Sequence, residues 1–291
     1  MIQGVLTAMV TPFRDGKVDF EKLAANVRFQ IGHGVDGLVP VGTTGESPTL
    51  SHEEHRKVIE TVVKEAAGRV KVVAGTGSNA TSEALDLTRH AHGVGADAAL
   101  MVSPYYNKPT QEGLYRHFMT VADAVDIPIV LYNIPGRTGV ALSIETIERL
   151  ARHANIVAVK EATGSLDAAS EIAARCDGKA LTLLSGDDSL TLPIMAVGGK
   201  GVVSVASNLV PDRVTAMVAA AARGDYAAAR QKHLALFPLV KALFIETNPI
   251  PIKTAMRLAG MDSGELRLPL CEMSDDHAAE LERVLSAHGV I

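Results

Sequence analysis

The chain has 291 residues, of which 47% are hydrophobic and 21% are charged, and its formal net charge is −5. This composition predicts a globular protein with a large core, and the absence of a dense Lys/Arg stripe argues against a nucleic-acid partner. The two cysteines lack CxxC spacing, and no apolar run approaches the roughly 18 to 20 residues that cross a bilayer, so we expect a cytoplasmic protein without disulfides or membrane contact.

Short apolar runs recur along the chain, separated by longer amphipathic segments. The first run lies within MIQGVLTAMVTPF, which has no basic start and contains Gln, Thr and Pro, so it predicts a strand and not a signal peptide. Eight runs are almost continuously apolar, as is typical of parallel strands that are buried on both faces. They cover residues 4–10, 36–42, 70–75, 97–103, 128–133, 156–160, 181–186 and 201–207.

Eight strand-helix units within about 220 residues match the size of a (β/α)8 TIM barrel, with a doubly wound sheet as the alternative. Ser51 and Glu54 have capping-box spacing at the start of one helix. From about residue 224 the pattern is helical, in segments near 225–246, 249–260 and 274–289. We therefore predict a catalytic barrel over residues 1–223 and a C-terminal helical extension over residues 224–291.

The sixth predicted strand lies in NIVAVKEATG and ends on Lys160. A buried ammonium is costly without a partner, so one interpretation has Lys160 reach solvent or pair with Glu161. The alternative is chemical, because a desolvated lysine can supply a neutral amine that attacks carbonyl groups.

Other reactive residue types also follow predicted strands. In a barrel, active-site groups lie at the carboxyl ends of the strands and in the loops that follow them. Thr43 and Thr44 follow the second strand, Tyr132 ends the fifth with Arg137 in the next loop, and Gly186 ends the seventh. Turn formation explains the Gly, Thr, Asn and Pro residues, but not a lysine and a tyrosine that end neighbouring strands.

These residue types suit a carbonyl substrate that carries carboxylates. A tyrosine hydroxyl can relay the protons that imine formation requires. Backbone amides of the Thr43-Thr44 turn can hold one carboxylate, and Arg137 can bind a second one bidentately. A 2-oxo acid therefore fits better than a neutral sugar.

Competing motifs are weak. The segment GTGSNA at 75–80 is a poor dinucleotide fingerprint, because no acidic residue follows at the required place, and no P-loop run is present. His52 and His55 have i, i+3 spacing, and no histidine ends a predicted strand, which argues against a metal-dependent aldolase. We expect neither metal nor cofactor.

Several short motifs resemble those of a known family. GTTGE at 42–46, YNIP at 132–135, VKE at 159–161 and GDD at 186–188 are similar to those of the pyruvate-dependent class I aldolases and lyases, the N-acetylneuraminate lyase superfamily. PYYN at 104–107, GRTG at 136–139, NPIPIK at 248–253 and LRLP at 266–269 extend the resemblance to nearly the whole chain. PYYN and GRTG point to the branch that condenses pyruvate with L-aspartate 4-semialdehyde to 4-hydroxy-2,3,4,5-tetrahydrodipicolinate for lysine and diaminopimelate synthesis.

The resemblance implies a role for each matching residue. Lys160 is expected to form a Schiff base with pyruvate. The implied proton relay consists of Tyr132, Thr44 and Tyr106, with Tyr106 reaching in from a neighbouring subunit. Thr43 and Thr44 are implied to hold the pyruvate carboxylate, and Arg137 that of the aldehyde, whereas Gly186 and Val203 line the pocket.

A second set resembles the allosteric L-lysine pocket of feedback-inhibited members, with Glu83 available for the effector's amino group. It comprises Ser47, His52, His55, Asn79, Glu83 and Tyr105. Pro48 departs from the small residue often found there, which leaves the strength of inhibition open. The alternative is that His52, His55 and Glu83 are ordinary polar residues of helix faces.

The resemblance also implies a homotetramer built as a dimer of dimers, because Tyr106 must cross an interface. Two rival functions stay open. One is another pyruvate-dependent class I aldolase that acts on sugar acids, and the other is a non-catalytic barrel that binds 2-oxo acids.

Overall fold

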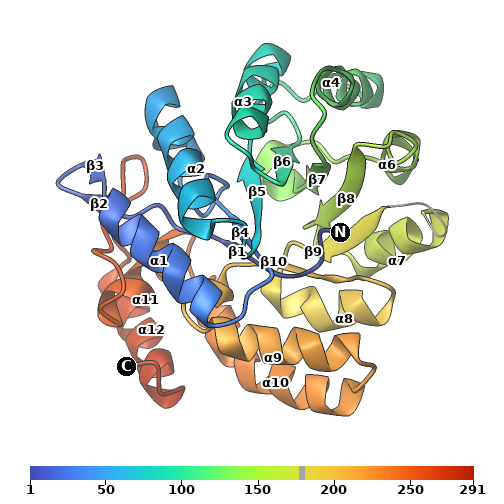
Figure 1. Ribbon diagram of the computed structural model, residues 1–291. Coiled ribbons are helices and arrows are strands. Elements are labelled where there is room, and N and C mark those ends of the chain that lie inside the picture. Colours follow the sequence, from blue (N-terminus) through green and yellow to red (C-terminus); the bar gives the residue numbers. More distant parts are fainter. Residues whose placement is uncertain (177–180) are drawn as a thin grey trace.

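A computed structural model describes residues 1–176 and 181–291. Figure 1 shows a ring of strands enclosed by helices, with the C-terminal segment in red outside the ring. The strands form a closed barrel in the order β1-β10-β9-β8-β7-β6-β5-β4. The first strand pairs with the last, with Gly4 opposite Gly201. The (β/α)8 barrel is therefore confirmed, and a doubly wound sheet, which would leave two open edges, is wrong.

All eight predicted strands are present. They are β1 (Gly4–Ala8), β4 (Gly37–Val39), β5 (Lys71–Gly75), β6 (Ala98–Val102), β7 (Ile129–Asn133), β8 (Ile156–Glu161), β9 (Thr182–Ser185) and β10 (Gly201–Ser204). Several end earlier than their apolar runs do. The run 36–42 yields only Gly37–Val39, because residues 40–46 turn into a loop, and the run 201–207 ends in the 3-10 helix η3 (Ala206–Asn208).

Helices follow the strands and cover the outside of the barrel (Figure 1). They are α1 (Phe20–Gly32), α2 (His52–Ala66), α3 (Thr81–Gly93), α4 (Gln111–Ala124), α5 (Pro135–Thr138), α6 (Ile144–Leu150), α7 (Leu166–Arg175), α8 (Thr191–Ala196) and α9 (Pro211–Ala222), with η1 (Ser47–Thr49) and η2 (Asp188–Leu190) between them. The predicted capping box of α2 is present, since Glu54 N donates to Ser51 Oγ at 3.2 Å and Ser51 N donates to Glu54 Oε2 at 2.9 Å. None of the described helices is long and apolar enough to span a membrane.

The interior of the barrel is filled by side chains from alternate strand positions. Leu6, Val73 and Ala158 belong to this buried cluster, which Tyr132 also joins. Residues two apart on a strand face the same side, so Lys160 faces the interior directly above Ala158. The interior of the barrel is therefore apolar up to the carboxyl ends of the strands, where polar side chains such as that of Lys160 take over.

A small hairpin, β2 (Phe13–Arg14) and β3 (Lys17–Val18), follows β1 and is missing from the sequence prediction. Its turn residues Asp15 and Gly16 have φ values of 52° and 75°. Two left-handed turn residues are what a type I′ hairpin requires, and Asp-Gly is a preferred pair for it. The Asp-Gly pair in the sequence therefore indicated a hairpin turn, but the two strands are too short to show an apolar run.

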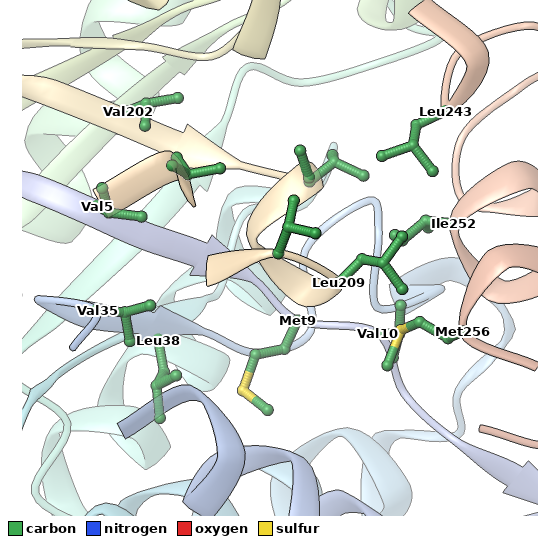
Figure 2. Packing of buried hydrophobic residues seen from close by; sticks show 14 of the residues in the cluster. Val5, Met9, Val10, Val35, Leu38, Val202, Leu209, Leu243, Ile252 and Met256 are labelled. Carbon is green, nitrogen blue, oxygen red and sulfur yellow. The ribbon is translucent and has the colours of Figure 1, made fainter. Parts of the chain in front are cut away.

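The C-terminal helices α10 (Tyr226–Ala242), α11 (Ile250–Leu258) and α12 (Asp275–Ala287) share a core with the barrel. Figure 2 shows Ile252 and Met256 of α11 beside Val10 and Leu209, and all four are buried in one cluster. Helix α11 thereby lies against the carboxyl end of β1, close to the loops of the barrel mouth. The division into units 1–223 and 224–291 stays a prediction.

Candidate active site

Lys160 and Tyr132 lie side by side at the carboxyl ends of β8 and β7. The register of the two strands sets them opposite one another, and Lys160 Nζ lies 3.9 Å from the centroid of the Tyr132 ring. Both are buried, with 6% and 5% of their surface exposed. Among the residues that the structure describes, Lys160 forms no ion pair within 4.0 Å. The amine is thus desolvated and stacked on a phenol, with no carboxylate to hold it.

Glu161 follows Lys160 but points to the other face of the strand, as consecutive strand residues do. Its carboxylate accepts hydrogen bonds from Asn133 Nδ2 at 3.1 Å and from Thr163 N at 2.6 Å. Glu161 therefore secures the loop behind the strand and does not pair with Lys160. The interpretation of Lys160 as a solvated or Glu161-paired lysine is wrong for this structure.

Gly186 directly follows β9 and lies near this pair, and Val203 lies on β10. A Cβ atom at position 186 would lie 3.1 Å from Lys160 Cε and 2.7 Å from Ala162 Cβ, so only glycine leaves room there. Val203 is buried in the same interior cluster as Tyr132. Gly186 therefore borders the space around the amine, whereas the predicted role of Val203 in lining the pocket stays a prediction.

The loop after β4 carries Thr43 and Thr44 and has an unusual backbone. Val41 and Glu46, near its two ends, have φ values of 51° and 53°, a left-handed conformation that a β-branched valine rarely adopts. Gly45 permits this path, since a Cβ atom there would lie 3.0 Å from Val41 N. Thr44 is buried and Thr43 is half-buried. The backbone conformation of this loop is therefore determined by contacts with the rest of the protein and not by the conformational preferences of its own residues.

Asn248, which precedes α11, connects two of the predicted site residues. Its Nδ2 donates to Thr44 Oγ1 at 3.0 Å, and Arg137 Nη2 donates to its carbonyl oxygen at 3.0 Å. Thr44 and Arg137 are therefore brought to one mouth of the barrel. Asn248 had no assigned role in the sequence analysis, because its partners lie more than 100 residues away and local patterns do not report such contacts.

Tyr106 is the predicted site residue that the structure does not bring to the others. It lies in the loop after β6, it is 90% exposed, and its φ of 72° is left-handed. Its side chain projects away from its own chain. The predicted entry of Tyr106 into a neighbouring subunit stays a prediction.

A cavity of about 380 Å³ opens at the carboxyl face and is lined by some residues of both predicted sets, although Lys160 and Thr44 are not among its lining residues. Thr43, Tyr132 and Arg137 line it together with residues of the second set, namely Ser47, His52, His55, Glu83 and Tyr105. The resemblance implied two separate sites. In the structure, members of both sets line one cavity.

The second set is internally connected. His52 Nε2 lies 2.9 Å from Glu83 Oε1, and Ser78 Oγ donates to the other oxygen of Glu83. Burial, aided by nearby His52, lowers the pKa of His55 to about 4, so His55 is neutral at pH 7. Asn79 Nδ2 donates to the carbonyl oxygen of Tyr105 at 3.2 Å. The second set therefore offers one carboxylate, a neutral His55, and hydroxyl and amide groups.

The arrangement is suited to addition chemistry at a carbonyl carbon. It supplies a buried amine, an adjacent phenol, a threonine hydroxyl and an arginine at the rim, which are the groups that imine formation and carboxylate binding need. Within the described ranges, no group of three or more His, Cys, Asp and Glu residues could hold a metal ion.

Comparison with known proteins gives a consistent result. The profile of the Dihydrodipicolinate synthetase family matches residues 1–288. The 4-hydroxy-tetrahydrodipicolinate synthase of Methanocaldococcus jannaschii is 56% identical over 292 residues, which cover 100% of both chains. The enzyme of the same name from Aquifex aeolicus is 55% identical and matches 100% of this chain and 99% of its own.

Two similar solved structures contain small molecules. The chloride-inhibited dihydrodipicolinate synthase from Acinetobacter baumannii, complexed with pyruvate, superimposes with a TM-score of 0.98 at 42% identity and full coverage of both chains. The enzyme from Cyanidioschyzon merolae with lysine bound has a TM-score of 0.96 at 40% identity and covers 99% of each chain.

Proposed function

The chain belongs to the dihydrodipicolinate synthetase family, lyases of lysine and diaminopimelate biosynthesis, and on that premise we propose that it condenses pyruvate with L-aspartate 4-semialdehyde through a Schiff base on Lys160. The observation that carries this proposal is the buried amine of Lys160, 3.9 Å from the ring centroid of Tyr132 and without an ion-pair partner among the described residues.

The first half of the reaction binds pyruvate. The unprotonated amine of Lys160 attacks C2 of pyruvate, the nitrogen loses a proton, and the carbonyl oxygen takes one up, which gives a carbinolamine. A second proton lets this oxygen leave as water, and the nitrogen lone pair forms the protonated imine. Tyr132, whose ring lies against the amine, is the proposed acid-base group, and Thr44 continues the relay towards the mouth, where its hydroxyl accepts from Asn248 Nδ2.

The second half forms the new carbon-carbon bond. Loss of a proton from C3 converts the imine into an enamine, and C3 then attacks the aldehyde carbon of the semialdehyde, whose oxygen takes up a proton. The amino group of the second substrate next attacks C2, the ring closes, and the bond to Lys160 breaks. Arg137 at the rim receives the carboxylate of this second substrate. One water is released overall, in the dehydration step.

Trapping of the imine tests the proposal. The protein is incubated with pyruvate and sodium borohydride, and intact mass is compared between the parent chain and Lys160→Ala. We expect one pyruvate-sized addition in the parent and none in the variant. A parent chain that binds pyruvate without an addition would instead be a non-catalytic 2-oxo-acid-binding barrel.

The identity of the aldehyde needs a separate assay. Pyruvate consumption is measured with L-aspartate 4-semialdehyde and with longer sugar-derived aldehydes. We expect turnover with the semialdehyde, and a pronounced rise of its KM in Arg137→Ala, because a charged bidentate contact is lost. Turnover with the sugar-derived aldehydes alone would identify the sugar-acid aldolase.

We also propose that Tyr106 completes the relay of a neighbouring copy within a homotetramer. Its exposure of 90% supports a role outside its own chain. Lys160→Ala and Tyr106→Phe chains are mixed, dissociated and reassembled. If Tyr106 acts across the interface, mixed dimers contain one site with both residues intact and regain activity. If it acts within its own chain, no activity returns.

L-Lysine is the proposed effector at the second set, where the Glu83 carboxylate can take its amino group. The proposal is supported by the cavity lining and by the lysine bound to the relative from Cyanidioschyzon merolae. Activity is titrated with L-lysine in the parent chain and in Glu83→Gln. We expect inhibition in the parent and a clearly weaker effect in the variant. The expected cytoplasmic location stays a prediction.

A further inference from the structure

Lys253 and Glu46 form a fully buried ion pair beside the site. Lys253 Nζ lies 2.7 Å from Glu46 Oε1, and neither side chain has exposed surface. Lys253 lies on α11 and Glu46 ends the loop that carries Thr43 and Thr44, so the pair joins segments that are 207 residues apart in the chain. Neither residue had a predicted role, although both stand in the motifs that carry the family resemblance.

Lys253 is also the centre of further contacts with this loop. Its Nζ donates to the carbonyl oxygen of Thr11 at 3.0 Å and lies 4.2 Å from the centroid of the Phe13 ring. The hydroxyl of Thr11 in turn donates to the carbonyl oxygen of Gly45 at 2.7 Å. The other oxygen of Glu46 accepts from Arg267 N at 3.2 Å. The end of the loop is therefore fixed by the Lys253 ammonium, which binds Glu46 and Thr11, and by the bonds of Thr11 to Gly45 and of Arg267 to Glu46.

The backbone of the loop needs such support. Glu46 has a left-handed φ of 53°, and Val41 at the start of the loop has a φ of 51°. Such conformations persist in non-glycine residues only where the surroundings impose them. The amides and hydroxyls of Thr43 and Thr44 lie between these two strained residues. A small shift of Glu46 therefore moves the groups proposed to bind the pyruvate carboxylate.

We propose that Lys253 and Glu46 are positioning residues that hold the Thr43-Thr44 loop in the conformation that binds pyruvate. Helix α11 thereby contributes to the active site of the barrel. The inference rests on the proposed function, because it assigns the Thr43-Thr44 loop to the pyruvate carboxylate. A purely stabilising ion pair is the alternative. If the pair only stabilises the fold, a variant with restored stability also binds pyruvate normally. If the pair positions the loop, pyruvate binding stays weak in that variant.

A double variant separates the two roles. Lys253→Met with Glu46→Gln removes both charges at nearly constant volume, and the new amide oxygen can still accept from Arg267 N. Replacing both members of a buried pair by neutral groups often preserves stability, whereas replacing one does not. The pyruvate and semialdehyde KM values, the rate of imine trapping and the melting temperature are measured. Leu281→Ala, a buried residue of α12, serves as a control that destabilises the C-terminal segment without touching the loop.

We expect the double variant to melt near the parent temperature, with a pyruvate KM raised about tenfold, slower imine trapping and a semialdehyde KM within about twofold of the parent. Leu281→Ala should melt lower and keep the parent's pyruvate KM. A double variant with the parent's pyruvate KM overturns the inference. If the double variant does not fold, Glu46→Gln alone is measured, because it keeps an oxygen that accepts from Arg267 N and weakens the hold of Lys253 on the loop. This variant must raise the pyruvate KM, and an unchanged KM overturns the inference. A parent chain that traps no imine refutes the proposed function instead.

Discussion

Lys160 and Lys253 are both buried lysines whose amines lie over an aromatic ring, and they differ in what else the amine contacts. Lys253 lies 4.2 Å from the Phe13 centroid and also 2.7 Å from a carboxylate oxygen of Glu46. Lys160 lies 3.9 Å from the Tyr132 centroid and, within the described part of the chain, has no carboxylate at ion-pair distance. Burial alone therefore does not distinguish a reactive lysine from a structural one, but the presence of a partner does.

The difference follows from the cost of a buried charge. An unpaired ion in a protein interior is strongly unfavourable, whereas a well-paired one is tolerated. Burial lowers the pKa of Lys253, and the Glu46 carboxylate opposes that shift. Attack by Lys253 would require breaking this pair, whereas attack by Lys160 requires breaking none.

Replacement of the unpaired lysine should abolish catalysis. In Lys160→Ala we expect kcat to fall by about 10⁴-fold or more, because no covalent intermediate can form. Steady-state kinetics with both substrates measure the fall, and circular dichroism confirms that the variant is folded. Residual activity within about tenfold of the parent would remove Lys160 from the mechanism.

Replacement of the paired lysine should instead act on stability. Lys253→Met leaves the Glu46 carboxylate buried without its cation, so we expect the free energy of unfolding to fall by about 3–5 kcal/mol in urea titrations. Lys160→Met is the matched control and should change it by about 1 kcal/mol or less. Equal losses in the two variants would show that the two lysines do not differ in this way.

The role of the Tyr132 ring can be tested separately from the role of its hydroxyl. Tyr132→Phe keeps the ring that packs against the amine and removes the group proposed to relay protons. We expect kcat to fall by about 10²- to 10³-fold, with little change in the unfolding free energy. Single-turnover rates of imine formation locate the defect. A variant that forms the imine at the parent rate would assign the relay to another group.

A buried base without a carboxylate partner should also make the protein acid-sensitive. The folded-state pKa of His55, about 4, lies below its usual value of 6.5, chiefly because of burial. The unfolded chain therefore binds this proton more readily. Stability is fully present above pH 6.5 and is lost progressively as the pH falls towards 4, by up to about 3 kcal/mol. His55→Gln should lose less over this window in urea titrations, although His117, whose pKa burial also lowers to about 4, remains. An unchanged pH dependence would count against a buried neutral His55.

The sequence predicted the barrel because its signal is local. Each strand is a continuous apolar run, and the strand ends alone indicated that Lys160 and Tyr132 are neighbours. The early strand ends at Val39 and Ser204 were missed, because apolar residues continue into the loops that shape the mouth. The contacts of Asn248 and Lys253 were missed for another reason, since each joins segments more than 200 residues apart and leaves no periodic trace.

The pairing of β1 with β10 governs how this chain can be assembled during synthesis. One edge of β1 has no strand to pair with until residues 201–204 have been made. Closure over such a sequence separation is slow, and an open edge can recruit strands from other chains. A nascent chain that stops before β10 therefore presents the free edges of β1 and β9. Strand β10 closes the barrel and is synthesised last of the eight strands. The growing chain is therefore most prone to aggregation before β10 has been made.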